Sequence, residues 1–198
     1  MADRTSAHNA TLVLMLSAFV ITSVGCGKEL ILSKYGSKSG VSRTRSGFAI
    51  PRWRPHRGVD IKAYYVGDKV IASHGGTVAH VKFSKKAGWR ITIHHEPSGM
   101  YTRYVHLQSP IVKQGDDVRR GQKIGEVGLF PYSAKVVHVH WMLCTNARCF
   151  GAGALGGTKD PLKRSIGCFA KKRQYPHREL ALTLPVPCRN GRDGPELL

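Results

Sequence analysis

The chain has 198 residues, enough for one domain or for one domain with processing segments. Apolar residues make up 41% and charged residues 22%, which argues against wholesale disorder, collagen-like repeats and a polytopic membrane protein. Lys and Arg exceed Asp and Glu by 31 to 12, and the net charge of +19 favours polyanionic surroundings such as nucleic acid, anionic lipid or an acidic wall polymer.

The N-terminal region contains an apolar run of 11 residues, TLVLMLSAFVI at 11–21. A membrane-spanning helix needs about 20 apolar residues, whereas the core of a signal peptide needs ~7–15. The small residues Ser-Val-Gly precede Cys26 and resemble a lipoprotein cleavage box, in which the cysteine is acylated. We therefore expect a signal peptide over 1–25 and a lipid on Cys26. The alternatives are a plain cleaved signal and an uncleaved anchor.

Lipidation at Cys26 would make this a cell-envelope protein, held at the membrane by an N-terminal lipid anchor and facing the periplasm. Residues 26–46 are rich in Ser, Gly, Lys and Arg, which predicts a flexible tether with at most one short strand.

From residue 47 to 143, short runs of β-branched and aromatic residues alternate with glycine turns. No stretch of ten residues in this region has helical periodicity. Turn signals recur about every 8–12 residues, as in β-sandwiches and barrels. The region predicts an all-β domain.

Five side chains in this domain suit a zinc site. His56 and Asp60 are four residues apart and would share one face of an extended strand, as would His138 and His140. His106 ends the strand-like run YTRYVHL. A catalytic zinc keeps three protein ligands and one open position, so two histidines and one aspartate could form that shell. Two histidines would remain for proton handling.

Residues 144–198 form a basic, glycine-rich extension that we expect to be irregular, with few apolar residues to bury. It contains Cys144, Cys149, Cys168 and Cys188, with spacings of 5, 19 and 20 and no CxxC, which excludes a zinc ribbon. An even number in an exported protein predicts two disulfides, although free thiols remain an alternative. Three connectivities are open, and pairing 144 with 149 and 168 with 188 closes the shortest loops.

The order and spacing of several blocks resemble peptidase family M23, the LytM and lysostaphin type of zinc endopeptidases. These blocks are HRGVDI (56–61), GGTVAHV (75–81), YTRYVHL (101–107), VKQGDDVRRGQKIGEVG (112–128) and HVHW (138–141). The segment 129–137, LFPYSAKVV, departs from the Thr-Gly and small-residue run usual in the family. Because that segment helps to wall the substrate groove, the departure concerns specificity.

The resemblance implies a mainly antiparallel fold, with two sheets that form a groove over the metal. It also implies that His56, Asp60 and His140 bind one Zn²⁺ per chain, and that His106 and His138 are catalytic. The expected activity is that of a zinc metalloendopeptidase that cuts peptide bonds in peptidoglycan.

Two other functional classes fit part of the sequence. A non-catalytic relative would bind the wall and activate a partner amidase, but such a protein would have lost ligands, and all five positions are present here. A nucleic-acid-binding protein would fit the charge, but the export signal and the lack of a recognisable nucleic-acid motif oppose it. We therefore expect no nucleic acid partner.

Overall fold

The computed structural model describes residues 30–43, 49–51, 54–133, 136–176 and 179–188. The predicted signal peptide and Cys26 lie outside these residues. Among the described residues, no helix has the length and apolar character needed to span a membrane.

Twelve β-strands and two short 3₁₀ turns make up the described chain. In order they are β1 (Ile31–Ser33), β2 (Ser39–Arg43), β3 (Ala49–Pro51), β4 (Val59–Lys62), β5 (Lys69–Ile71), β6 (Gly76–Ser84), β7 (Gly88–His95), β8 (Met100–Pro110), β9 (Asp117–Val118), β10 (Lys123–Val127), η1 (Pro131–Ser133), β11 (His138–Cys144), β12 (Thr158–Lys159) and η2 (Pro161–Arg164). The expectation of an all-β, mainly antiparallel fold is confirmed.

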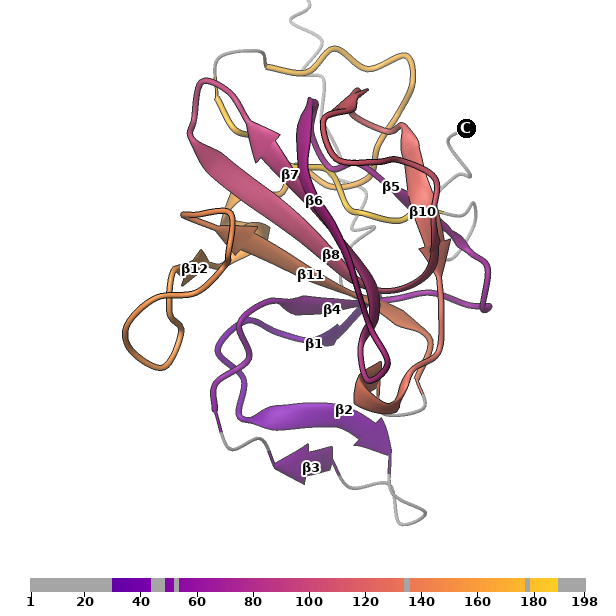
Figure 1. Ribbon diagram of the computed structural model, residues 1–198, viewed down its shortest axis with the longest axis vertical. Helices are drawn as coiled ribbons and strands as arrows, with labels where there is room; N and C mark the ends of the chain where they lie inside the picture. The colour runs from indigo at the N-terminus through magenta and orange to yellow at the C-terminus, as the bar shows by residue number, and fades with distance from the viewer. Residues whose placement is uncertain (1–29, 44–48, 52–53, 134–135, 177–178, 189–198) are drawn as a thin grey trace, which may run out of the picture.

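Ten of the strands belong to one sheet, and seven of them follow the order β1-β4-β11-β8-β7-β6-β9 (Figure 1). Strand β10 pairs with both β8 and β5, β12 pairs with β11, and β2 and β3 form a separate two-stranded sheet. We expected two sheets. Ten strands instead form one hydrogen-bonded sheet, because β10 pairs with β8 on one side and with β5 on the other.

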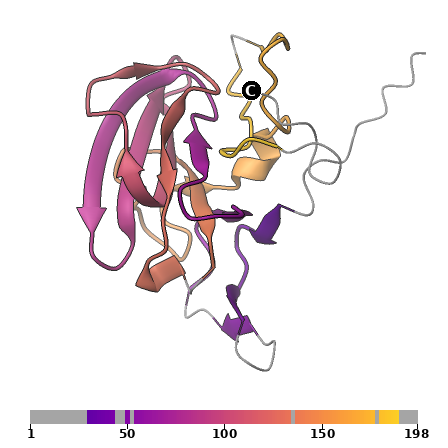
Figure 2. The same ribbon diagram turned by 90° about the vertical axis from the view of Figure 1, so that its right-hand side faces the viewer.

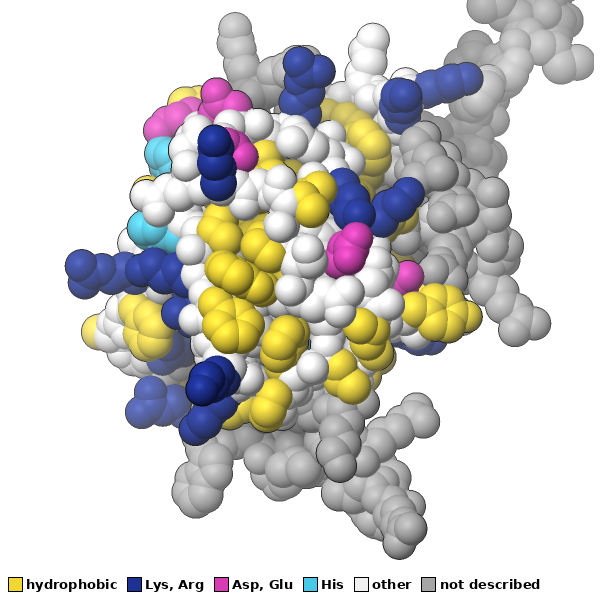
Figure 3. Space-filling view, turned by 45° about the vertical axis from the view of Figure 1, so that its right-hand side comes forward, with side chains coloured by type: hydrophobic (Ala, Val, Ile, Leu, Met, Phe, Trp, Pro, Cys, Tyr) yellow, Lys and Arg dark blue, Asp and Glu magenta, His cyan; other side chains and the backbone are white. Residues whose placement is uncertain are grey.

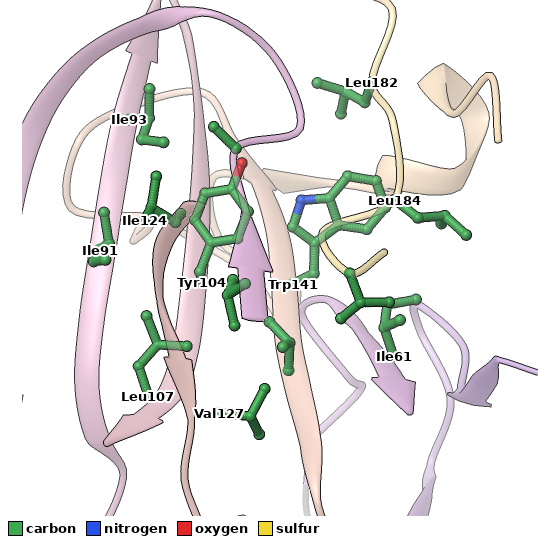
Figure 4. Packing of buried hydrophobic residues seen from close by; sticks show 14 of the residues in the cluster. Ile61, Ile91, Ile93, Tyr104, Leu107, Ile124, Val127, Trp141, Leu182 and Leu184 are labelled. Atoms are coloured by element: carbon green, nitrogen blue, oxygen red, sulfur yellow. The ribbon is translucent and has the colours of Figure 1, made fainter. Parts of the chain in front are cut away.

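Side chains alternate between the two faces along each strand, and the apolar core lies against the inner face of this sheet. On β8 and β11, Tyr104 and Trp141 point inward (Figure 4), and both are almost fully buried, as is Leu143. The alternating positions Val105, His138 and His140 lie on the outer face, which carries the polar cluster described below.

The C-terminal extension contributes to this core, contrary to our expectation that it has few apolar residues to bury. Leu180, Leu182, Leu184 and Val186 are at most 5% exposed and pack against the sheet. In Figure 2 the extension, in orange and yellow, lies beside the sheet. Its backbone is bonded to the sheet layer, since the amide of Ile71 donates to the carbonyl of Pro185 at 2.9 Å.

Two disulfides lie in the extension. They join Cys144 to Cys149 and Cys168 to Cys188, with Cα atoms 5.0 and 5.9 Å apart. This is the connectivity that closes the shortest loops.

Part of the segment that we expected to be a tether is structured. Leu30 is 1% exposed and belongs to the core, and β1 pairs with β4 through Ile31 and Ile61. The hydroxyl of Tyr35 donates to the carbonyl of Thr158 at 2.8 Å. The apolar residues of this segment are therefore used to extend the sheet.

Candidate metal centre

Strands β4 and β11 bring the predicted ligands together. His140 lies directly opposite Asp60 in their antiparallel register, so both side chains leave the same face of the sheet. Their neighbours in the chain, Ile61 and Trp141, enter the core. His56 lies in the turn before β4, four residues from Asp60.

The donor atoms of these three residues converge on one point. Asp60 Oδ1 lies 2.8 Å from His140 Nδ1 and 3.1 Å from His56 Nε2, and the two imidazole nitrogens are 2.9 Å apart. Zinc bonds of about 2.0–2.1 Å in a tetrahedral shell would place donors roughly 3.3 Å apart. A small expansion of this cluster would therefore accommodate a metal ion that prefers nitrogen and oxygen ligands.

A second layer of contacts orients His56. Its Nδ1 lies 3.1 Å from the carbonyl oxygen of Lys34 and 3.1 Å from Ser33 Oγ. A carbonyl can only accept, so Nδ1 carries the proton and Nε2 presents its lone pair to the cluster. Sequence reasoning missed both partners, because Ser33 and Lys34 fell in the expected tether.

The electrostatics of the cluster favour an ionised aspartate. Burial tends to raise the pKa of Asp60, but the contacts of its carboxylate with the rings of His140 and His56, and the charges of His140 and His138, outweigh it. The pKa of Asp60 is therefore held well below its usual value, and the site presents an anionic oxygen to a cation.

His106 reaches the site through an irregularity in β8. The register of β8 with β7 shifts between Tyr104 and Leu107, the register with β10 shifts between Leu107 and Ser109, and His106 has a φ of +69°. Strict alternation after Val105 would point His106 into the core, where Leu107 packs instead. A bulge of this kind re-aims a side chain, and here it turns the imidazole outward. Its ring centroid lies 4.9 Å from that of His138.

His106 and His138 each have one nitrogen committed to the backbone. His106 Nδ1 lies 3.1 Å from the carbonyl oxygen of Ala87, and His138 Nδ1 lies 2.8 Å from that of Val136. Both Nε2 atoms are therefore the ones without a proton in the neutral rings. His138 Nε2 is 3.6 Å from Asp60 Oδ1, and burial together with His138 and His140 lowers the pKa of His106 to about 3.

All five residues singled out from the sequence thus lie in one cluster: three around a point that can hold a cation and two beside it with proton-accepting nitrogens. The four disulfide cysteines supply no donor to it. Cys26 lies outside the described residues.

Comparison with known proteins agrees with this arrangement. Residues 54–150 match the model of peptidase family M23. Peptidoglycan DD-endopeptidase ShyA of Vibrio cholerae is 34% identical over 147 residues, which cover 72% of this chain and 33% of that protein. An uncharacterised metalloprotease of Buchnera aphidicola is 36% identical over 110 residues, 56% of this chain and 28% of that protein. The chain thus spans about a third of the length of these curated relatives.

Among solved structures, the catalytic domain of lysostaphin from Staphylococcus simulans superposes with a TM-score of 0.50 at 26% identity. The match covers 66% of this chain and 87% of that domain.

Proposed function

This chain belongs to peptidase family M23, and we propose that it is a zinc metalloendopeptidase that hydrolyses peptide bonds in peptidoglycan. The observation that carries the proposal is the convergence of His56, Asp60 and His140 on one point, with His106 and His138 beside it. ShyA, which is named a peptidoglycan DD-endopeptidase, supports the choice of substrate.

In this proposal His56, Asp60 and His140 hold one Zn²⁺ per chain. Bound zinc supplies Lewis acidity, which polarises a carbonyl oxygen and makes water acidic enough to attack near neutral pH. The protein contributes two neutral imidazoles and one carboxylate, a ligand set that zinc accepts in catalytic sites. The bond from His56 Nδ1 to the carbonyl of Lys34 keeps the ligating nitrogen aimed at the site.

His106 and His138 handle the protons. Each ring donates its Nδ1 proton to a backbone carbonyl, so Nε2 is the atom that can take a proton from the attacking water. The same atom can later return the proton to the leaving amine. A protonated ring at this position also stabilises negative charge on the attacked carbonyl oxygen.

A non-catalytic envelope protein that binds wall and activates an amidase is the alternative. It would have no need of two oriented imidazoles beside an intact ligand set, so the site favours the enzyme. The net charge of +19 suits either protein, since both would work beside anionic wall polymer.

Digestion of purified peptidoglycan by the full chain tests the activity. Mass analysis should show newly freed peptides, and the masses identify the bond that is cut. A chelator should stop their release and added zinc should restore it. Full activity in metal-free protein, or an unchanged wall after digestion, would refute the proposal.

We also propose that the protein is a lipoprotein of the cell envelope, anchored in the membrane through Cys26 and exposed to the periplasm. The small-residue box before Cys26 supports this, as does the even number of cysteines that remains without it. In expressing cells, the mature chain should begin at residue 26, carry acyl groups and fractionate with membranes. Cys26→Ser should abolish acylation, and an unmodified, soluble wild-type chain would contradict the prediction.

A further inference from the structure

A positively charged hollow of about 210 Å³ lies on the outer face of the sheet, between β6, β7, β8 and the loop that follows β11. We call it the basic hollow, and define it by His80, Lys82, Arg90, Arg103, Arg148 and Phe150. No acidic side chain lies among the described residues that line it. It is separate from the cluster of five residues at the metal centre.

The basic hollow shares one sheet face with the metal centre. Val105 pairs with His140, and Arg90 on the next strand lies opposite the bulge at residues 105 and 106. Lys82 pairs in turn with Arg90. Neighbouring strands are 4.7–4.9 Å apart, so Arg90 and Lys82 begin about 10 and 14 Å from His140, in line across the sheet.

The loop side of the hollow is also continuous with the metal centre. Phe150 lines the hollow, and the guanidinium of Arg57 stacks over its ring at 5.3 Å. Arg57 directly follows His56 in the chain. A molecule that lies along this face can therefore touch both regions.

Arg103 forms a fixed floor for the hollow. Its Nε donates to Thr92 Oγ1 at 2.9 Å, and its two Nη atoms donate to the carbonyls of Arg148 and Ala147 at 3.0 and 2.8 Å. Burial and the charge of Arg90 lower the pKa of Arg103 to about 10, as expected for a cation without a carboxylate partner.

The remaining cations are uncompensated. Lys82 and Arg90 lie directly opposite each other, an arrangement of like charges that destabilises a sheet. Within the described part of the chain, no ion pair joins either side chain to an acidic group. Several cations are thus gathered in a concave site whose lining, in the described part of the chain, supplies no opposite charge.

We propose that the basic hollow binds free carboxylates of an acidic peptide, about three residues from the bond placed at the metal centre. The inference rests on the proposed function and deepens it, since it names the class of peptide that the site selects. An extended peptide advances about 3.3 Å per residue, so three residues span the 10 Å between His140 and Arg90. Arg90 supplies paired N–H donors that match a carboxylate.

Binding of synthetic peptides to the full chain tests the proposal without requiring catalysis. One probe is a short peptide with free side-chain carboxylates, and the other is the same peptide with these groups as amides. Calorimetry should show about tenfold tighter binding of the acidic peptide, in line with one or two charge-assisted hydrogen bonds. The double variant Lys82→Gln, Arg90→Gln should bind both peptides equally.

The matched control is Lys113→Gln, Arg119→Gln, which removes the same two charges from exposed positions outside the hollow. It should keep the preference for the acidic peptide. Equal binding of both peptides by the wild type, or a preference that survives in the Lys82, Arg90 variant, would overturn the inference. Tight binding of a poly(glycerol phosphate) polymer in place of either peptide would assign the hollow to a wall polymer instead.

The outcome is separable from that of the proposed function. A wild type that prefers the acidic peptide but releases no peptides from peptidoglycan would uphold the hollow and refute the enzyme. A wild type that digests peptidoglycan with zinc but binds both peptides alike would do the reverse.

Discussion

Asp60 is the residue on which the charge of the site depends. It is 1% exposed, and one of its carboxylate oxygens lies within 3.6 Å of nitrogens of His56, His138 and His140. A single buried anion thus organises three imidazoles. His56 and His140 each have a ring nitrogen within 3.1 Å of Asp60 Oδ1, and these two nitrogens are 2.9 Å apart, so they are assigned as metal ligands. His138 lies farther from Asp60, at 3.6 Å, and is assigned as a proton carrier.

Metal content separates these two roles. Asp60→Ala should leave the protein without zinc, because it removes the only anionic donor of the cluster. His106→Ala should keep zinc but lose roughly 10²–10⁴-fold in peptidase activity, the usual contribution of a general acid or base. Zinc is measured by atomic emission on protein dialysed against trace metal. Loss of zinc from the His106 variant would show that the roles are wrongly divided.

His95 carries a second residue-scale prediction, away from the metal centre. It is fully buried, with Nδ1 2.8 Å from the carbonyl oxygen of Gly75 and Nε2 2.8 Å from Thr102 Oγ1. Burial lowers its pKa to about 4, and the charges of His74, His94 and Arg120 act in the same direction. The folded protein therefore holds this ring neutral where an unfolded chain would protonate it.

The folded pKa of His95 lies below the unfolded one, so the unfolded state gains a proton first as the pH falls through about 6.5. The free energy of unfolding should drop on this account by about 2 kcal/mol between pH 7.5 and 5.0. Urea denaturation at both pH values should show a smaller drop in His95→Gln than in the wild type. An equal drop in both proteins would contradict the assignment.

At the scale of elements, the bulge in β8 is what completes the site. The block YTRYVHL predicts a strand that ends in His106, but simple alternation would send that imidazole into the core. The residue is re-aimed because β8 shifts register against β7 between Tyr104 and Leu107, and it shifts again against β10 between Leu107 and Ser109. No local pattern encodes this shift, since it depends on three strands at once. The order of the sequence blocks was enough to identify His106 as a site residue. The direction of its side chain could be seen only in the folded structure.

The close approach of β4 and β11 is a further element-scale feature. A Cβ on Gly58 would lie 2.5 Å from the carbonyl oxygen of Trp141 and 3.0 Å from His140 Cε1. Gly58→Ala should therefore push the strands apart, cost about 1–3 kcal/mol of stability and weaken metal binding through His140. Urea denaturation and zinc titration measure the two effects.

Gly75→Ala is the control for this prediction, because its Cβ would meet its nearest neighbour, the carbonyl oxygen of Val118, only at 3.4 Å. It should leave zinc affinity unchanged. Equal zinc affinity in Gly58→Ala and in the wild type would show that the strands adjust without disturbing His140.

The extension shows what sequence reasoning overlooked. Leu180, Leu182, Leu184 and Val186 alternate with other residues, which is the pattern of a half-buried strand. Pro185 and Pro187 interrupt that pattern and argue against a strand, because proline lacks a backbone donor. The segment lies extended with few ladder bonds, yet it buries its alternating side chains. The composition of the extension therefore suggested a loop, whereas residues 180–186 form an extended segment whose apolar side chains belong to the core.

At the scale of the whole molecule, the basic side chains and the apolar side chains occupy different regions. Figure 3 shows hydrophobic side chains gathered in the middle of one face, with Lys and Arg toward its edges. The ten-stranded sheet and residues 180–188 enclose the main apolar core, so the terminal segments described here are parts of the domain. Exposed Lys and Arg side chains, such as Lys113 and Arg119, place positive charge on the surface, where it is available for contacts with anionic polymer.

The disulfide between Cys168 and Cys188 holds residues 180–188 to this core. Its residues are 20 apart in the chain, and loop closure over that length should stabilise the fold by about 3 kcal/mol. Replacing both cysteines with serine should lower the free energy of unfolding by that amount, while zinc content stays unchanged because neither sulfur is near the ligands. Replacing both Cys144 and Cys149 with serine opens a shorter loop, with a sequence separation of 5, and should cost less, about 2 kcal/mol.

Thiol titration of denatured, unreduced Cys26→Ser protein tests whether both disulfides form, and it should find no free thiol. Two free thiols would show that only one disulfide forms, and four would show that neither does.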